Sequence, residues 1–280
     1  MSTDFEVPGI HGQVVVRRWN TAHPRYVVLL AHGYGEHPGR YEHLANALTA
    51  DGAVVYAPDH AGHGRSAGER ARADLIEDMV TDLRAVATRA GTENTTLPTI
   101  LIGHSMGGII ATRYAQRYGD LTALVLSAPV IGGNPGFTAL LDLDPLPEVP
   151  LSPDLLSRDP SVGQAYLADE LVYHGPLQRE TLRGLLDAVD TVAAGGSLGA
   201  LPTLWLHGEL DGLAPLDATR PAVDRVAGTA MQSKVYEGAQ HEIFNETNRD
   251  EVVSDVIAFF DGIPALRRDR TTSPSCNAST

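Results

Sequence analysis

The chain has 280 residues, which is long enough for one large α/β domain whose core needs no covalent cross-links. Acidic residues outnumber basic ones 35 to 21, and the formal net charge of −14 argues against nucleic acid as a partner and against electrostatic docking on anionic lipid. The one cysteine, Cys276, excludes an intrachain disulfide and a cysteine-based zinc site.

No apolar run approaches the roughly 20 residues that a membrane span needs. Residues 1–13 lack the basic region and apolar core of a Sec-type signal peptide. We therefore expect a cytoplasmic protein.

Short β-branched runs alternate with amphipathic segments in the first half of the chain. The later runs are almost continuously apolar, which is typical of strands buried on both faces, and the alternation predicts a mostly parallel α/β sheet. Residues 74–89 place Leu75, Met79, Leu83 and Val86 on one apolar helical face. Strands are expected at 13–19, 25–31, 53–58, 98–103, 122–127, 202–207 and 233–236, and further helices at 40–49 and 249–261.

The alternation stops between residues 132 and 199, where prolines separate short helical pieces. We interpret 132–199 as a helical cap inserted into one core made of 1–131 and 200–266, and 267–280 as a disordered tail. Leucines and acidic residues are interleaved in the cap. This pattern favours a lid whose apolar face contacts an apolar substrate, and the alternative is ordinary amphipathic packing. These leucines are Leu140, Leu141, Leu143, Leu146 and Leu151.

Residues 103–107 (GHSMG) match the G-x-S-x-G pattern, which by itself is a weak signal. Here the pattern follows a buried strand and opens a helix, as a nucleophile elbow requires. We predict that Ser105 is the nucleophile. The Met106 amide at the start of that helix is a predicted oxyanion donor.

A serine nucleophile needs a general base, and the base needs a carboxylate to orient it. On this scaffold both follow the serine in the chain. Beyond Ser105 the histidines are His174 in the cap, His207 at a strand end and His241 in a loop after the last strand. The loop position favours His241 as the base.

The acid is expected in the loop after strand 202–207. Asp211 is the preferred residue, with Glu209 and Asp217 as alternatives. Asp217 is expected to cap the following helix.

Residues 32–35 (HGYG) directly follow an early strand, so the Tyr34 amide is predicted to be the second oxyanion donor. The nearby histidines 32, 37, 43, 60 and 63 have no diagnostic metal-ligand spacing. We expect neither a metal nor an organic cofactor.

Six segments carry a resemblance to a known family: 31–48, 59–70, 101–108, 157–160, 207–215 and 236–246. The stretches HGYGEHPGRY and DHAGHGRSAGER are far more specific than the elbow. Through them the chain resembles the monoacylglycerol lipases of the α/β-hydrolase superfamily, bacterial type.

The resemblance implies the α/β-hydrolase fold and cleavage of a monoacylglycerol through an acyl-enzyme. It implies the same roles for Ser105, Asp211 and His241, and it places His104 and Tyr166 near the glycerol moiety. The lipid substrate would be the partner, with peripheral contact to lipid aggregates through the cap. A broad carboxylesterase or lysophospholipase with the same triad is the alternative. The oligomeric state is not predicted.

Overall fold

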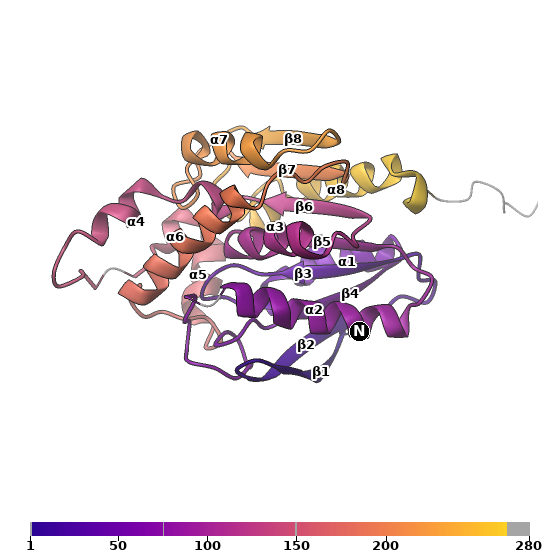
Figure 1. Cartoon of the computed structure of the whole chain (residues 1–280), viewed down its shortest axis with the longest axis horizontal. Helices are drawn as coiled ribbons and strands as arrows, with labels where there is room; N and C mark the ends of the chain where they lie inside the picture. Colours follow the sequence, from indigo (N-terminus) through magenta and orange to yellow (C-terminus); the bar gives the residue numbers. More distant parts are fainter. Residues whose placement is uncertain (1, 75, 149, 268–280) are drawn as a thin grey trace, which may run out of the picture.

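The structure is a computed structural model that describes residues 2–74, 76–148 and 150–267. Its centre is an eight-stranded sheet with the strand order β1-β2-β4-β3-β5-β6-β7-β8 (Figure 1). All pairs from β4 to β8 are parallel, while β1 and β2 form an antiparallel hairpin that joins β4. The strands are β1 (Ser2–Gly9), β2 (Gly12–Trp19), β3 (Tyr26–Ala31), β4 (Ala53–Pro58), β5 (Thr99–His104), β6 (Ala123–Ser127), β7 (Thr203–Gly208) and β8 (Met231–Tyr236).

The mostly parallel sheet flanked by helices confirms the predicted fold class. The sequence analysis missed β1. This edge strand is polar and mostly exposed, so it carries no apolar run to reveal it.

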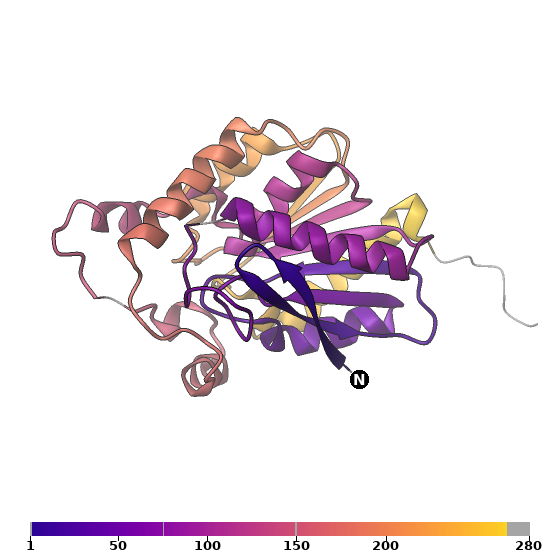
Figure 2. The same cartoon turned by 60° about the horizontal axis from the view of Figure 1, so that its bottom comes forward.

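Both faces of the sheet are covered by helices, and alternate residues of β3 show it. Val27, Leu29 and Ala31 join one apolar cluster with α2 (Ile76–Glu93), α3 (Met106–Tyr118) and α6 (Arg179–Ala194). Tyr26, Val28 and Leu30 join a second cluster with α1 (Glu42–Ala50) and α8 (Arg249–Gly262). Figures 1 and 2 show α2 and α3 on one side of the sheet. The continuous apolar runs of the central strands follow from this double coverage. The helix between β7 and β8 is α7 (Leu216–Val226).

The segment between β6 and β7 holds α4 (Pro135–Leu140), α5 (Pro160–Ala168) and α6 (Arg179–Ala194), with no strand among its described residues. In Figure 1, α4 and α5 lie beyond the ends of the strands. The later turns of α6 instead pack Ala188 and Val192 into the main core beside α3.

Among the residues that the structure describes, no helix is both long and apolar enough to cross a bilayer. The predicted tail from residue 268 onward, including Cys276, and the helix residue Leu75 lie outside the described residues.

The core makes one prediction about stability. Leu29 is fully buried in the central strand β3, so Leu29→Ala should lower the free energy of unfolding by about 2–5 kcal/mol, through lost burial and a residual cavity. Urea unfolding measures this. Ile10→Ala is the control, because Ile10 is 51% exposed. It should change stability by less than about 0.5 kcal/mol, and an equal loss in both variants would contradict the prediction.

Candidate active site

Ser105 occupies a sharp turn between β5 and α3. Its backbone is left-handed, with φ 57° and ψ −119°, which is unusual for a residue with a side chain. A Cβ at Gly103 would lie 2.3 Å from the Gly107 carbonyl oxygen, and one at Gly107 would lie 2.1 Å from that of Ala31. The two glycines are therefore needed for the strand, the turn and the helix to pack this closely.

The structure brings Ser105, His241 and Asp211 together at the carboxyl edge of the sheet. Ser105 Oγ lies 2.8 Å from His241 Nε2, and His241 Nδ1 lies 2.8 Å from Asp211 Oδ2. With Nδ1 donating to the carboxylate, Nε2 is free to accept the serine proton. Asp211 follows β7 and His241 follows β8, as the sequence analysis expected.

Asp211 is held by more than the histidine. Its Oδ1 accepts hydrogen bonds from the amides of Leu213 and Ala214, at 2.9 and 2.8 Å. Burial raises the pKa of Asp211, but His241, together with the Ala214 amide, more than offsets burial, so that the pKa of Asp211 lies below its usual value. The carboxylate is therefore ionised and fixed in place.

The two alternative acids lie elsewhere. Glu209 accepts a hydrogen bond from the Gly238 amide in an exposed loop. Asp217 lies in the first turn of α7, whose N-cap is Pro215, and no side-chain bond caps this helix. The expectation that Asp217 is a capping residue is therefore wrong, because the helix begins one residue earlier at Leu216.

His207, which the sequence analysis placed at a strand end and gave no role, lies next to the acid loop after β7. It is fully buried, and its Nε2 lies 2.7 Å from the Ala214 carbonyl oxygen and 3.4 Å from Asp211 Oδ2. Burial lowers its pKa, so the ring is neutral and Nε2 carries a proton that points toward the acid loop.

The pKa of His241, the predicted base, is shifted in the opposite direction to that of His207. Burial works against protonation of His241, but Asp211, with help from Glu242 and Glu36, raises its pKa above the usual value. The ring of His104 lies 4.8 Å away, and burial together with His241 lowers the pKa of His104 to about 3. One imidazole is therefore suited to take a proton, while its neighbour stays neutral.

The loop that carries Tyr34 lies directly against the nucleophile. A Cβ at Gly33 would come within 3.1 Å of Ser105 Cβ, and the Gly33 amide donates to Glu36 Oε1 at 2.6 Å. Met106 starts α3, where the first amides have no partner within the helix. Tyr34 and Met106 both line the same cavity as Ser105. The arrangement is suited to hold an oxyanion.

Ser105 lines a cavity at the carboxyl edge of the sheet. One end carries polar groups, and the rest is apolar. Of the five cap leucines predicted to face a substrate, Leu151 lines it, whereas the other four, all described, are not among its lining residues. The apolar wall consists of Tyr34, Met106, Val130, Phe137, Leu151, Leu156, Tyr166, Leu177, Leu182, Leu185 and Leu213.

His104 and Tyr166, which the resemblance places near glycerol, also line the cavity. His104 Nδ1 lies 3.1 Å from Ser127 Oγ. Tyr166 is 5% exposed and stacks on Arg40, with its ring centroid 5.2 Å from the guanidinium carbon. Burial raises the pKa of Tyr166 to about 12, so its phenol stays protonated.

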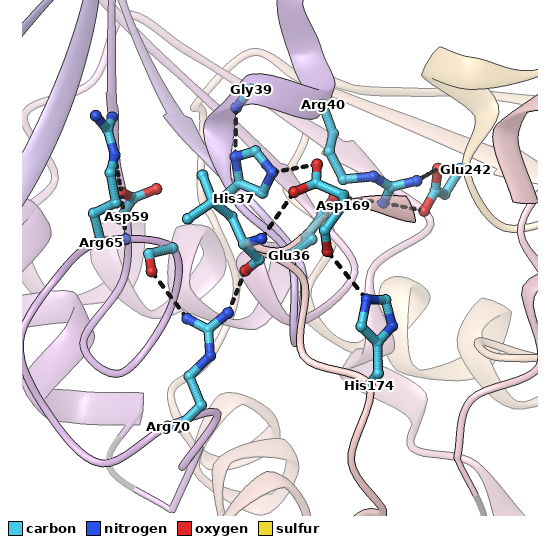
Figure 3. A network of polar contacts seen from close by, with 12 residues as sticks. Glu36, His37, Gly39, Arg40, Asp59, Arg65, Arg70, Asp169, His174 and Glu242 are labelled. Atoms are coloured by element: carbon cyan, nitrogen blue, oxygen red, sulfur yellow. Dashed lines mark hydrogen bonds and ion pairs between the residues drawn. The ribbon is translucent and has the colours of Figure 1, made fainter. Parts of the chain in front are cut away.

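The sequence analysis missed a buried ionic network beside the base. Arg40 donates to Glu36 Oε2 at 2.9 Å and to the two carboxylate oxygens of Glu242 at 2.5 and 2.8 Å (Figure 3). Both glutamates line the cavity. The spacing of four residues between Glu36 and Arg40, and the charge next to His241, were the available signals.

His32, His60 and His63 are buried together near residues 33–35, the loop predicted to hold the oxyanion (the oxyanion loop). His32 and His60 have ring centroids 4.3 Å apart, and burial lowers the pKa of all three residues. Across residues 2–74, 76–148 and 150–267, no cluster of three or more His, Cys, Asp or Glu side chains has metal-binding geometry.

The family model of serine aminopeptidase S33 matches residues 22–248. The monoacylglycerol lipase of Mycolicibacterium smegmatis is 41% identical over 84% of this chain and 88% of the relative. Human monoglyceride lipase is 33% identical over 82% of this chain and 80% of the relative. The crystal structure of Paleococcus ferrophilus monoacylglycerol lipase superposes with a TM-score of 0.74, at 27% identity over 87% of this chain and 97% of that one.

The chain belongs to this serine hydrolase family. Within the α/β-hydrolase superfamily it stands with the monoacylglycerol lipases, and it is a carboxylic ester hydrolase.

The acid makes a second prediction. Asp211→Asn should leave this hydrolase folded but lower kcat by about 10⁴-fold, because the amide cannot hold the base in its productive tautomer. Turnover of a soluble ester measures the effect, with Glu209→Gln as the matched control that keeps its rate. A rate close to wild type for Asp211→Asn would assign the acid role to Glu209 or Asp217.

The base makes a third prediction, about pH. Serine attack needs neutral His241, and the pKa of His241 is raised, so kcat/KM should rise with pH through an acid limb above the ordinary histidine value of 6.5. A profile of kcat/KM from about pH 5 to 9 tests this. An acid limb below the ordinary value would show that burial outweighs the carboxylates.

Proposed function

We propose that this enzyme hydrolyses monoacylglycerols to a free fatty acid and glycerol. One observation carries the proposal: the Ser105–His241–Asp211 chain opens into a cavity that is apolar along most of its wall and polar beside the serine. A monoacylglycerol has the same distribution: a long apolar chain lies on one side of its ester and the small polar glycerol on the other.

The reaction follows from the geometry. Ser105 Oγ attacks the ester carbonyl as His241 Nε2 takes its proton, and Asp211 stabilises the resulting imidazolium. The amides of Tyr34 and Met106 hold the oxyanion, each donor contributing about 3–4 kcal/mol at comparable sites. Collapse of the intermediate breaks the ester bond, and His241 returns the proton to the departing glycerol. Water then repeats the sequence on the acyl-enzyme and releases the fatty acid.

The glycerol is assigned to the polar end, beside His104 and Tyr166. The neutral His104 ring and the protonated Tyr166 phenol are suited to hydrogen-bond uncharged hydroxyls. The acyl chain is assigned to the apolar wall, part of which comes from the cap at 132–199.

The proposal includes a cytoplasmic enzyme that contacts lipid aggregates peripherally through the cap. Three cap leucines support this contact: Leu143, Leu155 and Leu167 are 47%, 38% and 63% exposed. The net charge of −14 opposes anionic lipid, so the contact would be hydrophobic.

Fatty-acid release from a long-chain monoacylglycerol, with the matching di- and triacylglycerols alongside, tests the function. We expect turnover of the monoester and its loss in Ser105→Ala, because no other hydroxyl is paired with His241 in the described part of the chain. Ser254→Ala, on the exposed side of α8, is the matched control and should keep full activity.

Two outcomes would overturn parts of the proposal. Activity retained in Ser105→Ala would reject the nucleophile. Turnover of short soluble esters without turnover of the long monoester would keep the triad and indicate a general carboxylesterase instead.

A further inference from the structure

Arg40 lies at a buried junction between three segments that are far apart in the sequence. Its side chain is 8% exposed, and the carboxylates that it bridges, Glu36 and Glu242, are 5% and 6% exposed. Tyr166 of the cap covers the guanidinium with its ring. Figure 3 shows Arg40 reaching from the loop after β3 toward Glu242.

Glu36 connects this junction to the oxyanion loop. Its Oε1 accepts the Gly33 amide at 2.6 Å and the Tyr41 hydroxyl, while its Oε2 accepts Arg40. Gly33 directly precedes Tyr34, so the position of the Glu36 carboxylate helps to set the direction of the Tyr34 amide.

Glu242 connects the junction to the base. It directly follows His241, and its carboxylate accepts two bonds from Arg40 and one from Asn245. Its own amide donates to the Leu156 carbonyl oxygen of the cap at 2.7 Å. Arg40 therefore joins the oxyanion loop and the base loop through paired, charge-assisted hydrogen bonds.

The junction also sets the charge around the base. Two carboxylates share one guanidinium, and both carboxylates favour protonation of His241. The charged and titratable groups that face His241 come from several elements. They are His104 at the end of β5, His207 in β7, Asp211 after β7, Glu36 and Arg40 after β3, and Glu242 in its own loop.

We propose that Arg40 is a positioning residue for ester hydrolysis: it holds the oxyanion loop and the base loop at a fixed separation through Glu36 and Glu242, and balances their charge beside His241. It touches none of the reacting atoms. The proposal rests on the hydrolase reaction described above, but not on the identity of the ester.

The chain offers a matched control for a purely structural role. Arg25 pairs with the buried carboxylate of Asp51, which also accepts the Tyr26 hydroxyl at 2.8 Å. This set repeats the arginine, carboxylate and tyrosine of Arg40, Glu36 and Tyr41, with an aspartate in place of the glutamate. This second network lies at the start of β3, at the opposite edge of the sheet from Ser105.

The test uses Arg40→Met, Arg40→Lys, Glu242→Gln and the control Arg25→Met in the full chain. For each, kcat and KM for a short soluble ester are measured across pH, together with thermal unfolding. Arg40→Met should lower kcat roughly 100-fold with little change in KM, the effect of a small misplacement of reacting groups. Arg40→Lys keeps the charge without the paired bonds, so it should recover part of kcat.

The pH profiles give the sharper signature, because the two charge changes act in opposite directions. Arg40→Met leaves two carboxylates without their cation, so the acid limb of kcat/KM should move to higher pH. Glu242→Gln removes a carboxylate, so the acid limb should move to lower pH. Arg25→Met should lower the unfolding temperature but leave kcat and the acid limb unchanged.

Arg40→Met with the wild-type kcat and acid limb would overturn the proposal, as would an Arg25→Met variant that reproduces its changes. If Arg40→Met does not fold, Arg40→Lys and Glu242→Gln decide: an unmoved acid limb in Glu242→Gln, or wild-type kcat in Arg40→Lys, overturns it. A wild-type enzyme that cleaves the soluble ester but no monoacylglycerol contradicts the substrate assignment and leaves this test intact.

Discussion

The strained turn at Ser105 is the constraint on which the active site depends. A left-handed backbone at a residue with a side chain costs on the order of 1–3 kcal/mol and persists only where the surroundings enforce it. Here β5 and α3 press together through Gly103 and Gly107, and Gly107 packs against the Ala31 carbonyl of β3. The turn places the serine hydroxyl at the edge of the sheet and the first amides of α3 beside it.

The parallel sheet brings the partners of Ser105, His241 and Asp211, to the same place. Because neighbouring parallel strands end at one edge, the loops after β5, β7 and β8 meet there, although Ser105 and His241 are separated by 136 residues. These loops are buried, and the low dielectric constant there strengthens the electrostatic interaction between neighbouring groups. The two adjacent imidazoles show the effect: His241, paired with Asp211, has a raised pKa, while His104, paired with the neutral Ser127 hydroxyl, has a lowered one.

The proposed cap, residues 132–199, is joined to the loop after β3 that packs against Ser105. His37 Nε2 lies 2.8 Å from the Asp169 carboxylate, and the Tyr173 amide donates to the Gly35 carbonyl oxygen at 2.7 Å. Figure 3 shows Asp169 between His37 and Arg40. The proposed cap is therefore attached to the loop at residues 33–37 after β3, and Arg40 connects that loop to Glu242, next to His241.

The sequence by itself determined the features that depend on local chemistry. The apolar runs revealed the central strands, the glycines around Ser105 revealed the turn, and the loops after the last two strands revealed Asp211 and His241. Only the tertiary structure decided which cap residues line the cavity, that His207 supports the acid, and that Arg40 joins Glu36 to Glu242. The polar edge strand β1 was missed because it carries no apolar run, and of the five cap leucines expected to meet the substrate only Leu151 lines the cavity. Hydrophobic periodicity indicates which face of a helix or strand is apolar, but not which distant residues that face contacts. The contacts of His207, of Arg40 and of the cavity wall join residues far apart in the chain, and packing sets their geometry.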